Sequence, residues 1–86
     1  MKIGDVFISG EAAVTDLKFK VVQAYAEQEK KNGKVKSSRM ILKIENLNIL
    51  KEDYREGLYH RLRYFEITKE KFNNLIERKV IKHDTK

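Results

Sequence analysis

The chain has 86 residues, enough for one small domain, and it contains no cysteine, which excludes disulfides, thiolate metal sites and cysteine nucleophiles. Charged residues make up 37% of the chain and hydrophobic residues 41%, which predicts a single folded domain over residues 1–86 with a heavily charged surface. The net charge is +6, and no apolar stretch approaches the roughly 18 residues of a membrane span. A small chain without disulfides or a signal peptide is typical of the cytoplasm, so we expect a soluble cytoplasmic protein without membrane contacts.

One segment accounts for the net charge. Residues 30–43 contain six of the 19 Lys/Arg residues and no acid, so the rest of the chain holds 13 basic residues (19 minus 6) against 13 acidic ones. A local excess of this kind indicates contact with a polyanion, an acidic partner or water.

The N-terminal residues 3–8 are typical of a short first strand. After them, residues 15–45 fit two structures. Read as strands, apolar and polar residues alternate on both sides of Asn32-Gly33, a sequence that favours the type I′ turn of a β-hairpin. A hairpin centred there pairs residues whose numbers sum to 65, which matches apolar with apolar residues and opposite charges with each other. The predicted pairs are Tyr25 with Met40, Val21 with Ile44, Glu29 with Lys36, and Lys20 with Glu45.

The same region also fits a helix. An apolar stripe at helical spacing runs through it, and Gly33 could end the helix after Lys30 and Lys31. The AYAEQEKK segment favours this helix, whereas LKFKVV favours the strand. The consistent cross-strand register leads us to predict the hairpin.

The C-terminal half contains three further predicted elements. Residues 49–57 form a short helix ending at Gly57, and residues 58–67 form a strand that shows Tyr59, Arg61, Arg63 and Phe65 on one face. Thr68 is the expected N-cap of a helix over residues 69–81, with Ile67 and Phe72 as its hydrophobic staple. We expect a frayed tail at residues 83–86.

These elements predict an α+β fold: a small twisted antiparallel sheet of about three or four strands, with the hairpin at Asn32-Gly33 and a C-terminal helix on one face. The alternative is a small all-α bundle, which applies if residues 11–31 are helical.

The basic segment is the first candidate site. On the hairpin, its cations lie at a protruding tip where several ammonium groups could approach backbone phosphates together. Lysines at a hairpin tip also keep strands soluble, so a purely solvated tip and an acidic protein partner remain open. The candidate residues are Lys30, Lys31, Lys34, Lys36 and Arg39.

A second candidate is the YHRLRYF run at residues 59–65, where aromatic and basic side chains alternate. A strand presenting Tyr59, Arg61 and Arg63 would suit single-stranded RNA or DNA, because aromatics stack on bases and arginine binds phosphates. Alternatively, the aromatics are core residues and the arginines pair with glutamates.

No motif predicts a metal, cofactor or catalytic site. His60 and His83 lie far apart in sequence, and the four glycines are too scattered for a phosphate-binding loop. We therefore predict a non-enzymatic protein without cofactors.

One family resemblance suggests an activity. The ISGEAA sequence at residues 8–13, with Asp16-Leu17 and AYAE at residues 24–27, resembles the first strand and helix of RelE/ParE-type toxins, many of which cleave mRNA. The resemblance implies a ribonuclease that cleaves phosphodiester bonds. The side chains that would stabilise the reaction and transfer its protons are Arg61, Arg63, Tyr64 and His60.

The sequence therefore predicts a small basic binding module that contacts nucleic acid, DNA or RNA, through its lysine-rich hairpin tip. Two alternatives are a phage- or mobile-element-encoded inhibitor that binds a host protein, and the toxin. A homodimer could form through an exposed strand edge.

Overall fold

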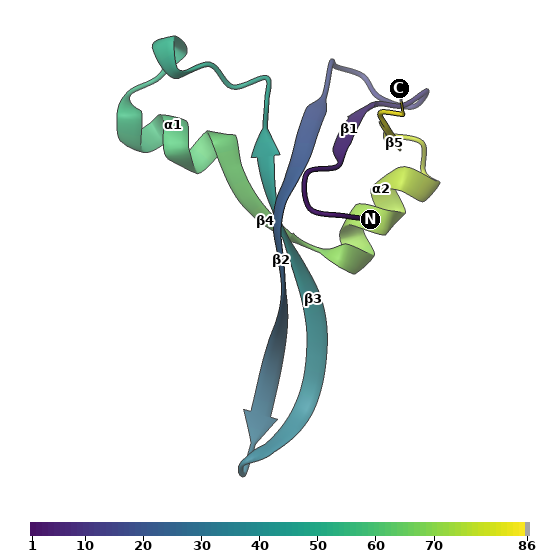
Figure 1. Cartoon of the computed structure of the whole chain (residues 1–86), viewed down its shortest axis with the longest axis vertical. Coiled ribbons are helices and arrows are strands. Elements are labelled where there is room, and N and C mark those ends of the chain that lie inside the picture. The colour runs from purple at the N-terminus through teal and green to yellow at the C-terminus, as the bar shows by residue number, and fades with distance from the viewer. Residues whose placement is uncertain (86) are drawn as a thin grey trace.

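The computed structural model describes residues 1–85 and has an α+β fold built on one antiparallel sheet (Figure 1). The sheet has five strands in the order β4-β3-β2-β1-β5, one more than the expected upper limit. The strands are β1 (Val6–Ser9), β2 (Lys18–Lys31), β3 (Lys34–Asn46), β4 (Tyr64–Thr68) and β5 (Ile81–His83). The helical elements are the 3-10 turn η1 (Lys51–Asp53) and the helices α1 (Glu56–Arg63) and α2 (Lys69–Glu77).

The predicted hairpin at Asn32-Gly33 is confirmed, and the all-α alternative is wrong because residues 18–31 form β2. Both turn residues have positive φ, 54° at Asn32 and 77° at Gly33, as a type I′ turn requires. The toxin resemblance required a helix over residues 24–27, and that part of it is wrong for the same reason.

The predicted register holds at both ends of the hairpin and fails in its middle. Val21 lies opposite Ile44 and Lys20 opposite Glu45, as expected. Register shifts between Val21 and Gln23 and between Glu29 and Lys30 displace the middle by one residue. As a result, Tyr25 lies opposite Ile41, and Glu29 lies opposite Ser37 rather than Lys36.

One face of the sheet, the core face, packs against α2. The buried cluster contains strand residues such as Val21 and Ile44, together with Phe72 of α2, whose ring centroid lies 4.9 Å from that of Phe7. The Thr68 cap is confirmed, because its side chain accepts a hydrogen bond from the Lys71 amide at 3.2 Å. The opposite face, here called the open face, is not covered by α2, and α1 lies on that side of the hairpin (Figure 1).

Helix α2 is shorter than the predicted helix over residues 69–81. Lys79 takes a φ of 60°, the Lys79 amide donates to Ile76, and the Val80 amide donates to Leu75. This is a Schellman termination. The chain then reverses into β5, where Ile81 is buried beside β1. The tail was expected to fray from residue 83, whereas β5 includes His83 and the Asp84 amide donates to Val6; Lys86 lies outside the described residues.

The prediction for residues 49–67 is confirmed only for the end of the strand, residues 64–67, and is wrong for residues 56–63. The expected helix over 49–57 is reduced to η1, and the expected strand over 58–67 begins only at Tyr64, because residues 56–63 form α1. Glu56 in the first turn and three basic residues in the last turn complement the helix dipole, and this pattern favours a helix.

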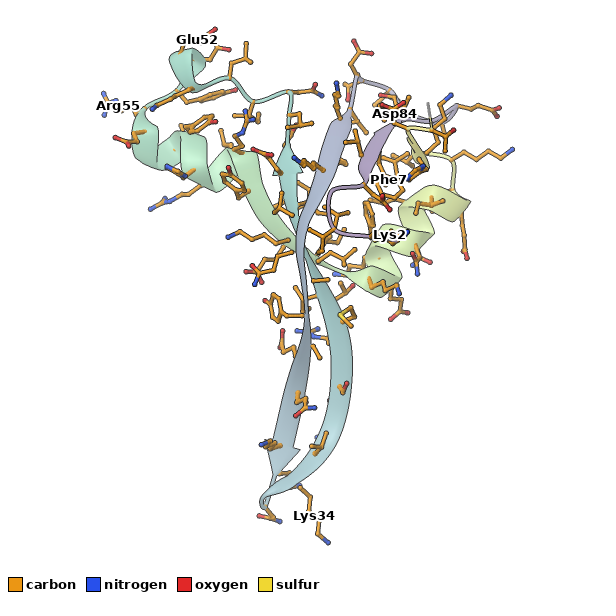
Figure 2. All side chains as sticks on the ribbon, viewed as in Figure 1. Lys2, Phe7, Lys34, Glu52, Arg55 and Asp84 are labelled. Atoms are coloured by element: carbon orange, nitrogen blue, oxygen red, sulfur yellow. The ribbon has the colours of Figure 1, made fainter. Side chains whose placement is uncertain are left out.

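The hairpin extends far beyond the core as a two-stranded arm (Figure 1). Every residue from 26 to 40 is exposed, and the molecule measures 46 Å along its longest axis. Figure 2 shows Lys34 at the free end of this arm, distant from Phe7 in the core.

Candidate nucleic-acid interface

The end of the arm concentrates unpaired positive charge. Lys31 and Lys34 lie directly opposite each other in the last pair before the turn, and Lys30 lies opposite Val35. All three lysines are exposed, and within residues 1–85 none has a carboxylate within 4 Å. Like charges opposite each other destabilise a strand pair. Repulsion within this tip cluster of Lys30, Lys31 and Lys34 therefore lowers the stability of the hairpin.

The other two predicted arm cations have acidic partners. The Arg39 guanidinium lies 3.1 Å from Glu27 across the ladder, and the Lys36 ammonium lies 3.9 Å from Glu29. Both pairs are exposed and contribute little to stability. The arm is therefore balanced in charge along its length and positive only at its tip.

The structure does not bring Tyr59, Arg61 and Arg63 together on one strand face, because all three lie on α1. Tyr59 and Arg63 are one helical turn apart, and the guanidinium carbon lies 5.5 Å from the Tyr59 ring centroid. Arg61 is exposed and has no ion pair among the described residues. Of these three, Arg61 alone presents an unpaired cation.

Arg63 ties α1 to the sheet and to the loop before it. Its Nε donates to Glu45 at 2.9 Å and its Nη1 to the Ile49 carbonyl at 2.6 Å, while Tyr64 also donates to Glu45. Burial by itself raises the pKa of Glu45, but the hydrogen bonds from Arg63 and Tyr64 outweigh it and hold that pKa below its ordinary value. In turn, the hydrogen bond that each donates to Glu45 raises the pKa of Arg63 and the pKa of Tyr64. These contacts give Arg63 a structural role.

Four lysines on the open face were not among the predicted site residues. Lys18, Lys20, Lys43 and Lys82 each lie next in sequence to a residue of the core or packed against it, so alternation along the strand points them away from α2. The sequence signal for these lysines was their alternation with apolar residues in LKFKV and ILKI. This alternation shows that the lysines share a face only once the buried face of each strand is known.

A surface hollow of about 500 Å³ lies between the arm and the start of α2. Its lining includes Met40, Glu70 and Asn74. Within residues 1–85, no three His, Asp or Glu side chains are placed to hold a metal ion. Neither helix has the length and apolar character needed to cross a membrane, again for the described residues.

Comparison with known proteins gives no relative for this chain: no family model, curated protein or solved structure matches it. The function must therefore be inferred from the chemistry of its surface.

Proposed function

We propose that the protein is a non-enzymatic nucleic-acid-binding module that uses the tip of its β2–β3 arm. The observation that carries the proposal is the directly opposed pair Lys31 and Lys34, with Lys30 beside it, on an arm whose other cations are paired with acids. An anionic ligand would relieve the repulsion between these lysines. The backbone phosphates of a nucleic acid bind lysine side chains whatever the base sequence. A two-stranded ribbon also fits the major groove of duplex DNA.

The tip makes this proposal directly testable. The variant with Lys30, Lys31 and Lys34 changed to Gln removes the unpaired charge and leaves the Asn32-Gly33 turn intact. We expect it to lose most binding to a labelled DNA duplex in fluorescence anisotropy, whereas the wild type binds with a log–log salt slope of roughly −3 to −4, for about four phosphates.

The matched control changes Lys2, Lys69 and Lys71 to Gln, which removes the same charge from the side of the molecule that carries α2. This control should bind almost as the wild type does. No binding by the wild type at about 50 mM salt, salt-independent binding, or an equal loss in both variants would refute the proposal.

A second candidate function is binding of an acidic protein, and α1 favours it. Leu58 and Leu62 lie one turn apart on α1 and are 47% and 39% exposed. Adjacent large apolar side chains in contact with water are unfavourable and are typical of a protein-binding surface. Arg55 precedes this stripe and Arg61 flanks it, so an acidic partner fits better than a second copy of the chain, whose arginines would repel.

A pull-down from nuclease-treated lysate separates the two functions. Protein binding predicts one stoichiometric acidic partner that is lost when Leu58 and Leu62 are changed to Ser and kept when the tip lysines are changed to Gln. Loss of that partner in the tip variant, or its retention in the leucine variant, would exclude α1 as the docking surface.

A further inference from the structure

The open face carries a second group of cations, the lysine platform formed by Lys18, Lys20, Lys43 and Lys82. The platform lysines lie on three strands, β2, β3 and β5: Lys18 and Lys82 both lie opposite Ile8 of β1, and Lys43 lies between Gln23 on β2 and Glu66 on β4. Directly opposed residues share a face, and strands are spaced about 4.8 Å apart. The four lysines therefore gather on one surface although they are far apart in sequence.

The acids on this surface neutralise the platform only in part. Glu45 lies opposite Lys20, but its carboxylate is bound by Arg63 and Tyr64. Glu66 lies opposite Lys43 and accepts a hydrogen bond from the Tyr25 hydroxyl, which raises the pKa of Tyr25 and leaves the carboxylate charge in place. Within residues 1–85, no platform lysine has a carboxylate within 4 Å.

The platform and the tip cluster are separated by a neutral span. Lys34 and Lys43 are nine positions apart on β3, a rise of about 30 Å, and Lys20 and Lys31 are eleven apart on β2, about 36 Å before the shortening caused by the bulge. The span between them is occupied by the paired charges of Arg39 with Glu27 and of Lys36 with Glu29. Because each strand has one bulge within its interval, the two positive anchors stand at most about 30–36 Å apart on one arm-and-sheet element.

This spacing corresponds to one turn of B-form DNA, about 34–36 Å, after which the same phosphate backbone returns to the same side of the duplex. A single strand would gain more from a continuous positive track than from two clusters with a neutral span between them. On the proposed nucleic-acid function, we propose that the ligand is double-stranded DNA and that platform and tip contact its backbone one turn apart.

A duplex-length series tests the two-anchor arrangement by fluorescence anisotropy at about 50 mM salt. Once corrected for the number of overlapping sites, the wild type should bind a duplex of about 16 bp at least about tenfold tighter than one of about 8 bp, because the second anchor then binds intramolecularly. On the longer duplex, where both anchors bind, the wild type should show a salt slope of about −6, steeper than the slope of roughly −3 to −4 expected for the tip on a short duplex. The variant with all four platform lysines changed to Gln should lose the gain in affinity, and its slope should become shallower by about 3.

The control changes Lys2, Lys69, Lys71 and Arg78 to Gln; it has the same net charge as the platform variant and should keep the length dependence. If the tip variant loses binding while the platform variant behaves as the wild type, the second anchor is wrong and the proposed function stands. If neither variant loses binding, both proposals fail. Two results would overturn the assignment to double-stranded DNA. One is binding of a single strand of about 16 nucleotides as tightly as the duplex of about 16 bp, and the other is tighter binding to an RNA duplex.

Discussion

Changing Arg63 to Gln should destabilise the fold, whereas changing Arg61 to Gln should not. The Arg63 side chain is 19% exposed and makes charged hydrogen bonds to Glu45, 15% exposed, and to the Ile49 carbonyl. A hydrogen bond to a charged group contributes about 1.5–3 kcal/mol. Since Tyr64 still donates to Glu45 and water can reach the carbonyl, we expect a net loss of about 2–3 kcal/mol for the two together.

A loss of this size is a large fraction of the stability of an 86-residue domain, about 4–13 kcal/mol. It should lower Tm by about 8–24 °C, at about 4–8 °C for each kcal/mol. The exposed Arg61 should change the free energy of unfolding by less than about 0.5 kcal/mol. Circular dichroism during thermal and urea unfolding measures both variants.

A double-mutant cycle with Glu45→Gln isolates the pair. Arg63 and Glu45 should show a coupling energy of about 1–2 kcal/mol, and Arg61 and Glu45 a value near zero. Similar Tm values for the Arg63 and Arg61 variants, or the absence of coupling between Arg63 and Glu45, would refute the structural role assigned to Arg63.

Four further changes test other parts of the structure. Lys34→Glu should stabilise the hairpin by about 0.2–1 kcal/mol, by replacing repulsion from Lys31 with attraction, and should weaken DNA binding; a variant less stable than the wild type in urea would contradict this. Thr68→Ala should cost about 1 kcal/mol through loss of the α2 cap, and an unchanged urea midpoint would show that the cap is dispensable. Gly10→Ala should cost about 1–3 kcal/mol, because its Cβ would lie 2.3 Å from a backbone carbonyl oxygen of the turn after α2; a wild-type Tm would disprove that contact. Since the folded-state pKa of Glu45 is lowered from 4.5, its contribution is present above that pH and is lost as the pH falls below it, so urea midpoints of Glu45→Gln should decline less steeply with acidification than those of the wild type.

The hairpin and the α2 cap could be predicted because short-range rules determine them. A type I′ turn needs positive φ at two successive residues, and Asn32-Gly33 tolerates it; Thr68 supplies the oxygen that the first turn of α2 needs. The location of the basic segment at an exposed tip followed directly from the turn.

The misassigned segments depended on contacts between distant parts of the chain. Residues 58–63 have side chains suited to strand or helix, and the anchoring of Arg63 on Glu45 accompanies the helix. Helix α2 ends at Glu77, and the positive φ that terminates it falls on Lys79 rather than on the glycine that usually marks such an end. Strand β5 follows because Ile81 is buried beside β1.

The amino-acid sequence alone determined where the excess charge lies along the chain, where the hairpin turns and where α2 begins, because each depends on neighbouring residues. Only the tertiary structure decided which cations are unpaired. Arg39 pairs with Glu27 on the neighbouring strand and Arg63 of α1 pairs with Glu45 of β3, whereas within residues 1–85 the tip lysines have no carboxylate within 4 Å. It also gathered the lysine platform on one surface, because the face toward which a strand residue points depends on where α2 packs.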